Sequence, residues 1–211
     1  MPELTRNQYR LTHRLRVRWA EVDLQRIVFN PHYLMYIDTA LTEYWRVMAI
    51  PYEAIPTSLG GELYVKKSTL EYHGSARLDD VLDVGCRCAR IGNSSMVFQA
   101  GIFRDDRLLV AGELVYVFAD PATQTSRRVP DLLRGLLESF EAGVSPIDVH
   151  VGNWDDLGAQ ASVLRREVFV EDLGIALAMD QDAQDAGAVH GLVRNRMGLA
   201  LATARLVQEG P

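Results

Sequence analysis

The sequence of 211 residues lacks any long uninterrupted run of apolar residues. A helix needs roughly 20 such residues to cross a bilayer, so a transmembrane helix is excluded. The first residues, MPELTRNQYR, also lack the apolar core of a secretory signal peptide. We therefore expect a cytoplasmic protein with no membrane partner.

Cysteine is scarce, and histidine is not clustered. The two cysteines, Cys86 and Cys88, lie two residues apart on a segment with strand character, where they point the same way but are poorly placed to form a disulfide. The five histidines show no spacing typical of metal ligands. The sequence predicts two reduced cysteines and no metal or other cofactor.

A basic surface is also missing, because the formal net charge is −6, which argues against a nucleic-acid partner. The charge is unevenly distributed along the chain. Residues 1–30 contain six arginines against three acidic residues, whereas residues 131–190 contain twelve acidic residues against three arginines. This shift indicates two different units joined near residue 140, with chance variation along one surface as the alternative.

The hydrophobic period changes early in the chain. Residues 11–19 alternate between apolar and arginine side chains, which predicts a half-buried strand with Trp19 on its inner face. A helical period follows, with Asn30 as a good N-cap and Pro31 at the first helical position. Pro51 is expected to end this helix.

The rest of residues 1–142 predicts one domain. Three of the expected strands are long and joined by short polar turns, which favours antiparallel pairing. One long antiparallel sheet with one helix lying across it is an α+β fold. The expected elements are strands at 63–72, 81–91, 96–104 and 108–118 and a helix at 130–141.

Residues 143–211 form the second predicted unit. It begins with a linker at 143–146, after which the pattern changes. The expected elements are a strand at 147–151, a helix at 157–170, and strands at 189–194 and 199–206.

Asp23 lies between the first strand and the long helix. An aspartate in such a loop is often only a turn or capping residue. Here the following helix presents free N–H groups and the positive end of its dipole. A carboxylate at that place can act as a base or nucleophile, and the amides of Asn30, His32 and the residues after it could stabilise an oxyanion.

The segment VRWAEVDLQRIVFNPHYLMYIDTALTEYW resembles the signature of the 4-hydroxybenzoyl-CoA thioesterase family. The likeness continues in YHGSARLDDVLDVGCRCARIGNSSMVFQAGIFR and in GELVYVFADPATQTSRRVP, so it covers about residues 11–140. The resemblance implies a hotdog fold, in which a long antiparallel sheet wraps around one central helix. It also implies hydrolysis of acyl-CoA thioesters at a site between two protomers, hence a homodimer or a tetramer.

The resemblance assigns roles to individual residues. Asp23 matches the family's catalytic carboxylate, which acts as nucleophile or as general base; the sequence leaves both open. Asn30 falls where the family uses a backbone amide to polarise the carbonyl, and it can be the N-cap as well. Tyr33 matches a family aromatic residue, and His32 stands where the residue type varies. Asn30, His32 and Tyr33 are therefore the candidate oxyanion and substrate-binding residues.

Two features depart from the family pattern. Arg26 stands where the family usually has glycine, so either the turn is built differently or a cation lies near the phosphates of CoA. The turn where some members carry basic residues for CoA reads Ile91-Gly-Asn-Ser-Ser95 instead. The expected CoA-binding residues are Arg26, Arg90, Ser94 and Ser95, with Arg77, Lys66, Lys67 or a partner subunit as alternatives.

The C-terminal segment resembles the first half of a GNAT-superfamily N-acetyltransferase. The shared features are Arg165 to Gly174, His190 opening a strand, and a strand ending in Ala202–Leu206. That family binds acetyl-CoA through a later glycine-rich loop at a helix N-terminus, which this sequence does not contain. We expect an incomplete GNAT-like unit that binds no acetyl-CoA, vestigial or part of a thioesterase–acetyltransferase fusion.

The sequence as a whole predicts an acyl-CoA thioesterase. The main alternative is a module that binds or senses acyl-CoA without turnover, which the arginine at position 26 and the missing basic turn would favour. The acyl group and the pathway are not readable from the sequence.

Overall fold

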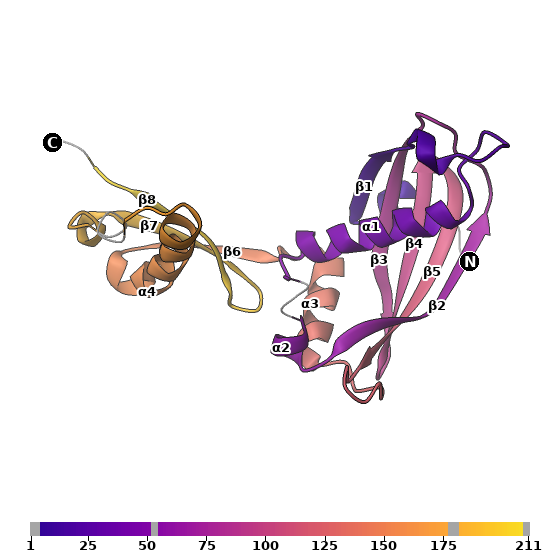
Figure 1. Cartoon of the computed structure of the whole chain (residues 1–211). Helices are drawn as coiled ribbons and strands as arrows, with labels where there is room; N and C mark the ends of the chain where they lie inside the picture. Colours follow the sequence, from indigo (N-terminus) through magenta and orange to yellow (C-terminus); the bar gives the residue numbers. More distant parts are fainter. Residues whose placement is uncertain (1–4, 52–54, 177–181, 209–211) are drawn as a thin grey trace. The chain divides into compact units, whose positions relative to one another are not determined.

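The computed structural model describes residues 5–51, 55–176 and 182–208 (Figure 1). The chain divides into two compact units, Met1–Val144 and Ser145–Pro211. The division falls within the predicted linker at 143–146. No helix in the described ranges is long and apolar enough to cross a membrane.

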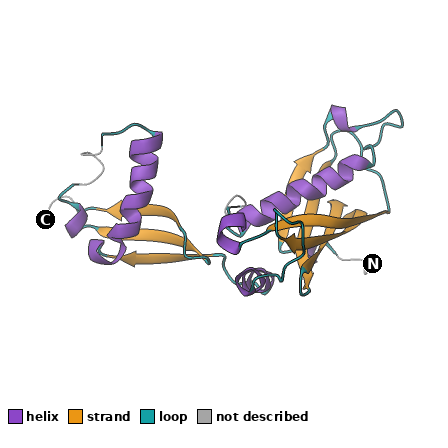
Figure 2. Ribbon diagram, turned by 60° about the horizontal axis from the view of Figure 1, so that its bottom comes forward, coloured by secondary structure: helices purple, strands orange, loops and turns teal. Residues whose placement is uncertain are grey.

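The first unit is built on a five-stranded antiparallel sheet with the order β1-β3-β4-β5-β2. Figure 2 shows the long helix α1 lying along one face of this sheet. The predicted meander of the three long strands is confirmed as β3-β4-β5, and β2 pairs with β5. The elements are β1 (Leu11–Arg16), α1 (Pro31–Val47), α2 (Ile55–Leu59), β2 (Glu62–Tyr72), β3 (Val81–Ile91), β4 (Ser95–Arg104), β5 (Arg107–Ala119) and α3 (Asp131–Glu141).

Helix α1 buries one face in the core. Its buried residues recur at spacings of three and four, and each large side chain removed from water contributes about 1.5–3 kcal/mol. Tyr44 is fully buried, and its hydroxyl donates to Oε1 of Glu141 at 2.5 Å. The same oxygen accepts from the N–H of Cys88 at 2.7 Å. One carboxylate thus ties α1, α3 and β3 together. The buried residues of α1 are Tyr33, Tyr36, Ile37, Ala40, Leu41, Tyr44 and Trp45.

The prediction that Trp19 faces the core is wrong. The strand β1 ends at Arg16, and Trp19 begins a 3₁₀ turn that extends to Glu21. The N–H of Val17 bonds to the carbonyl of Asp80 at 2.9 Å, and the chain turns immediately afterwards. Alternation therefore stops at Val17, which is buried, while Trp19 is 79% exposed.

The predicted positions of Asn30 as N-cap and Pro31 as first helical residue are confirmed, but Asn30 does not cap α1 through its side chain. Asn30 has helical dihedral angles (φ −49°, ψ −37°), and its side chain makes no capping hydrogen bond. Its carbonyl accepts from the N–H of Tyr33 at 3.3 Å. The helix ends at Val47, earlier than Pro51, because Ala49 takes a left-handed conformation with φ +54°.

The second unit is a three-stranded antiparallel sheet, with the order β6-β7-β8 and the helix α4 packed on β7 and β8. The predicted helix at 157–170 begins earlier, at Trp154, because the side chain of Asn153 accepts from the N–H of Asp156 at 2.9 Å. It also changes after Arg165 into a π-helical segment. The elements are β6 (Ile147–Gly152), α4 (Trp154–Arg165), the π-helix Arg166–Asp172, β7 (Val189–Asn195) and β8 (Ala200–Leu206).

Candidate active site

The candidate carboxylate Asp23 lies in a tight loop between β1 and α1. Its N–H donates to the carbonyl of Ile27, and its carbonyl accepts from the N–H of Arg26, both at 2.9 Å. Its side-chain Oδ1 accepts from the N–H of Gln25 at 2.7 Å. Its other oxygen, Oδ2, has no hydrogen-bond partner among the described residues. The loop therefore fixes a half-buried carboxylate with one oxygen free for chemistry.

The turn after Asp23 contains a residue in the left-handed backbone conformation. Arg26 has φ +61°, a conformation that glycine adopts without strain and that costs other residues about 1–2 kcal/mol. The idea that Arg26 reflects a differently built turn is therefore wrong. An arginine occupies the glycine conformation at this place.

Glu21 is a residue of the site for which the sequence predicted no role. Its side chain is 4% exposed, and it accepts from the backbone N–H of Arg18 at 2.7 Å, from Nε of Arg18 at 2.8 Å and from the hydroxyl of Tyr36 at 2.7 Å. Burial alone would raise the pKa of Glu21, but these hydrogen bonds together hold its pKa below the ordinary value. The carboxylate of Glu21 thus accepts three hydrogen bonds and holds the Asp23 loop in place.

Asp23 and His32 line one cavity of about 860 Å³. His32 lies in the first turn of α1, its N–H donates to the carbonyl of Phe29 at 2.9 Å, and its Nδ1 is buried without a partner among the described residues. Two cations, Arg26 and Arg77, lie in the same wall. The remaining wall is apolar, formed by Trp19, Ala20, Val22, Leu24, Phe29 and Leu78.

Asn30 and Tyr33 line a neighbouring hollow of about 380 Å³. The backbone N–H of Asn30 has no acceptor within the described part of the chain, so it is available to a ligand. Tyr33 is buried, and its hydroxyl accepts from the N–H of Ala76 at 2.8 Å. Burial outweighs that hydrogen bond and raises the pKa of Tyr33. We therefore assign Tyr33 to packing and to positioning the chain at Ala76.

Arg90, Ser94 and Ser95 lie far from Asp23 within one chain. Leu78 lines the Asp23 cavity, and β3 starts just after it, at Val81. With a rise of about 3.3 Å per residue, Arg90 lies roughly 30 Å further along that strand. The two serines belong to the hairpin beyond it. The structure therefore does not bring these three residues to the Asp23 cavity.

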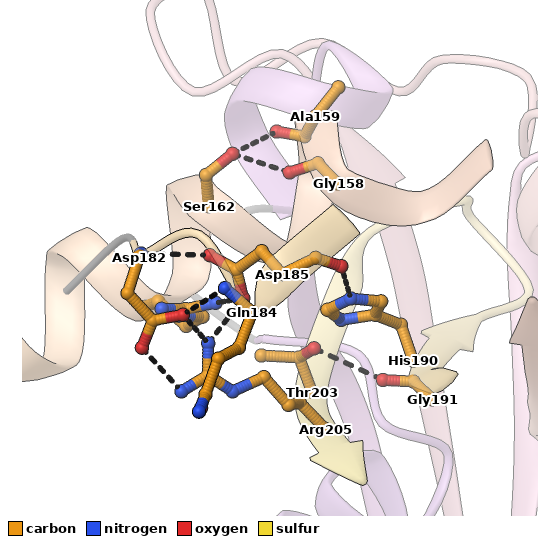
Figure 3. Close-up of polar contacts among 11 residues, drawn as sticks. Gly158, Ala159, Ser162, Asp182, Gln184, Asp185, His190, Gly191, Thr203 and Arg205 are labelled. Carbon is orange, nitrogen blue, oxygen red and sulfur yellow. Dashed lines mark hydrogen bonds and ion pairs between the residues drawn. The ribbon is translucent and has the colours of Figure 1, made fainter. Parts of the chain in front are cut away.

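The second unit has a polar cluster of its own, drawn in Figure 3. Asp185 bonds through Oδ1 to Nη1 of Arg165 at 2.8 Å and to Nη1 of Arg205 at 2.6 Å. Its carbonyl contacts Nε2 of the buried His190 at 2.8 Å. Asp182 pairs with Arg205 as well. These charges satisfy one another, so the cluster fixes the segment 182–187 on β7 and β8.

Comparison with known proteins relates the first unit to one superfamily. Residues 25–111 match the Thioesterase superfamily. The first unit is therefore similar to thioesterase superfamily domains. Over 117 residues it is 28% identical to the acyl-CoA thioester hydrolase YbgC of Escherichia coli, which is 55% of this chain and 87% of YbgC.

Solved structures share the fold of the first unit. A thioesterase superfamily protein of Jannaschia is similar with a TM-score of 0.59 at 18% identity, over 65% of this chain and 96% of that one. A thioesterase of Thermus thermophilus, solved with coenzyme A and Zn, gives 0.57 at 19% identity, over 64% and 96%. The predicted hotdog-like α+β fold is therefore confirmed for the first unit.

Proposed function

We propose that this thioesterase hydrolyses acyl-CoA thioesters to the free acid and CoA, with Asp23 as the catalytic residue. The observation that carries the proposal is the half-buried carboxylate with a free Oδ2 in the wall of the large apolar cavity. The similarity to YbgC supports the acyl-CoA substrate.

Asp23 can act in either of two ways. As a general base, its Oδ2 takes a proton from water while the water oxygen attacks the carbonyl carbon, the C–S bond breaks, and the proton passes to the leaving thiolate. As a nucleophile, Oδ2 attacks that carbon and the thiolate leaves; water then hydrolyses the resulting anhydride to the acid and the Asp23 carboxylate, and the proton released passes to the thiolate. Both routes end in the same acid and the same thiol.

The developing oxyanion needs hydrogen-bond donors that are not already used. We propose that the backbone N–H of Asn30 is this donor, because it is free within the described chain and lies at the start of α1, where the helix dipole favours negative charge. His32, which lines the cavity, contributes a polar contact to the substrate. In this proposal Tyr33 shapes the substrate path without touching the reacting atoms.

We further propose that the enzyme works as a homodimer or a tetramer. The candidate CoA-binding residues Arg90, Ser94 and Ser95 lie too far from Asp23 of the same chain, so they can serve its site only from a partner subunit. The measurement is the oligomeric state in solution, together with activity across the concentration at which the oligomer dissociates. Full activity of a monomer would remove this part of the proposal.

For the second unit, we propose an incomplete GNAT-like half-domain. Its order of strand, helix and two antiparallel strands supports the resemblance. The unit would bind no acetyl-CoA, which titration calorimetry of the full chain with acetyl-CoA under conditions that block the Asp23 cavity can test.

The experiment for the proposed activity measures thiol release from a panel of aliphatic and aromatic acyl-CoA substrates. Asp23→Asn keeps the Oδ1 acceptor for Gln25 and removes the charge, so turnover should fall by at least about a hundredfold. The matched control is Asp106→Asn, an exposed aspartate in the β4–β5 turn, which should leave turnover unchanged. CoA binding without thiol release in every variant would favour the alternative function, an acyl-CoA sensor.

A further inference from the structure

The strand β8 is an edge of the sheet in the second unit, because the strand order is β6-β7-β8. Its seven residues pair with β7, and Ala200–Leu206 makes no other backbone hydrogen bond among the described residues. About half of the N–H and C=O groups of an edge strand point away from its neighbour and remain unpaired. Such an edge can accept a further strand.

The sequence of β8 does not protect this edge. Edge strands are commonly guarded by proline, by lysine or by other charges, and Ala200–Leu206 contains no proline, lysine or acidic residue. Its one charge, on Arg205, is neutralised by Asp182 at 2.8 Å and by Asp185 at 2.6 Å (Figure 3). The opposite edge strand, β6, follows a proline directly and contains an aspartate and a histidine.

One whole face of this sheet is apolar. Helix α4 packs on the other face, where the ring of His190 lies 5.0 Å from that of Trp154. On the apolar face, no atom of the described chain lies within 4 Å of the place that a side chain at Gly191 would take. A solvated sheet face normally carries polar residues, so this face is not of that type. Its residues are Val149, Val151, Val189, Gly191, Val193, Ala202, Ala204 and Leu206.

The strand β8 is complementary to a second copy of itself. One antiparallel register pairs all seven residues, and it sets Thr203 opposite the partner's Thr203, a favourable cross-strand pair. Leu206, which is 72% exposed, then lies opposite the small side chain of the partner's Ala200. Arg205 lies opposite the partner's Leu201, so no two like charges face each other. The apolar faces of the two copies become continuous.

The size of this contact favours two copies that are already held together. A strand of seven residues spans roughly 23 Å, and pairing along one such edge falls below the roughly 1,200 Å² typical of stable interfaces between free proteins. A tether compensates for this, because it raises the effective concentration of the two partners. The chain that joins the two units at Val144 and Ser145 supplies the tether.

We infer that β8 is an interaction surface for a second copy of this chain. Two second units of one oligomer pair antiparallel through β8, and their three-stranded sheets join into one sheet of six strands. The inference rests on the oligomer proposed for the first unit and not on its catalytic chemistry. The contact uses the same surface on both copies and closes on itself, so it adds no chain to the oligomer.

The experiment is disulfide cross-linking of the full chain under mild oxidation, measured by non-reducing electrophoresis. The natural Cys86 and Cys88 are buried, so the wild type gives the background. Thr203→Cys places two thiols on directly opposite residues, whose Cα atoms lie about 4.5–5.5 Å apart, within reach of a disulfide. Ala200→Cys is the matched control on the same strand, because its two copies would lie roughly 40 Å apart along paired strands of opposite direction or at least 20 Å apart at their closest. Thr203→Cys should give at least about tenfold more linked dimer than Ala200→Cys.

A second variant tests the register without touching Thr203, whose hydroxyl donates to the carbonyl of Gly191 at 3.0 Å. Ala200→Cys and Leu206→Cys together in one chain should link two copies efficiently, whereas each change alone should not. The two positions are roughly 20 Å apart within one β8, so they form no disulfide inside a chain. Far-ultraviolet circular dichroism confirms that each variant is folded.

Three results would overturn the inference. Equal linkage of Thr203→Cys and Ala200→Cys would indicate parallel pairing or chance collision. No linkage in folded variants would show that β8 is free or is covered by another partner. A yield that falls in proportion when the protein is diluted about tenfold would show contact between separate oligomers, because pairing inside one oligomer does not depend on concentration.

Analytical ultracentrifugation of the wild type separates this inference from the proposed function. A monomeric chain removes the proposed oligomer and the β8 pairing with it. An oligomer whose Thr203→Cys variant does not link removes the pairing alone. Neither result changes the assignment of Asp23, which thiol release tests independently.

Discussion

The hydroxyl of Tyr36, on α1, donates a 2.7 Å hydrogen bond to Oε2 of Glu21, two residues before Asp23. The loop that carries the candidate catalytic carboxylate is therefore fastened to the central helix through a buried acid. Burial and the hydrogen bond to Glu21 together raise the pKa of Tyr36, so the phenol remains a donor throughout the neutral range.

Tyr36→Phe should destabilise the first unit by about 1.5–3 kcal/mol, the range for a hydrogen bond to a charged group. The reason is that a buried carboxylate loses one of its donors. Denaturant unfolding followed by circular dichroism gives the free energy of unfolding. Tyr64→Phe is the matched control, because Tyr64 makes a bond of the same 2.7 Å length to Glu62, which is more exposed than Glu21, and it should cost less than about 1 kcal/mol. Equal costs for the two variants would contradict the anchoring role of Glu21.

Arg26→Gly should stabilise the folded chain by up to about 1 kcal/mol, because glycine adopts φ +61° without strain. The gain is partly offset by the greater freedom of glycine in the unfolded chain. Gln25→Gly, at a neighbouring position without a positive φ, is the control and should destabilise. A stability gain together with a weaker affinity for CoA would separate the two roles of Arg26; a loss of stability would show that its side chain packs against the loop.

Acid should destabilise the second unit. Hydrogen bonds from Arg205 hold the pKa of Asp182 below its ordinary value. For Asp185, burial opposes ionisation, but Arg165 and Arg205 outweigh it and lower the pKa. Both carboxylates therefore stabilise the fold above about pH 4, the pKa of an unfolded aspartate, and this stabilisation disappears as the pH falls through their lower folded pKa values.

The measurement for this acid effect is fluorine NMR of the chain labelled with fluorotryptophan. Trp154 is the single tryptophan of the second unit, and its resonance is identified by its loss in Trp154→Phe. The acid midpoint of that resonance should respond to Asp185→Asn and not to Asp155→Asn. A resonance that is insensitive to pH down to 2 in the wild type would contradict the argument.

A chain that ends at Val144 should keep its thioesterase activity within about a factor of three and its oligomeric state unchanged, because few contacts cross a domain boundary. Thiol release and analytical ultracentrifugation provide the two readouts. Loss of hydrolysis in a folded, oligomeric truncated chain would show that the acidic second unit takes part in the active site.

Periodicity predicted the regular elements well because strands and helices repeat their pattern over many residues. Both ends of the strand 81–91 were predicted correctly. The prediction failed where the repeat ends: at Trp19, where a 3₁₀ turn begins, and after Arg165, where the helix becomes a π-helix. These boundaries depend on single contacts that no periodicity contains, such as the bond from Val17 to Asp80.

The candidate site was predictable only in part. The resemblance located Asp23, but Arg77 enters the same cavity from a loop more than 50 residues away in sequence. Its position depends on the pairing of Ala76 with Val28 across the fold. The separation of Arg90 from Asp23 has the same origin, since β3 begins near the Asp23 cavity and Arg90 lies near the other end of that strand. Distances of this kind follow from tertiary packing.

The chain contains only two thiols, Cys86 and Cys88, and both are free and buried in β3. Burial raises the pKa of both, that of Cys88 to about 12, so neither is a reactive thiolate near neutrality. A maleimide dye should therefore not react with the native protein. A cysteine introduced on the surface of either unit can then be labelled without first removing the natural cysteines. Because β3 lies between β1 and β4 in the sheet of the first unit, slow labelling of the natural pair then measures the rate at which that sheet opens.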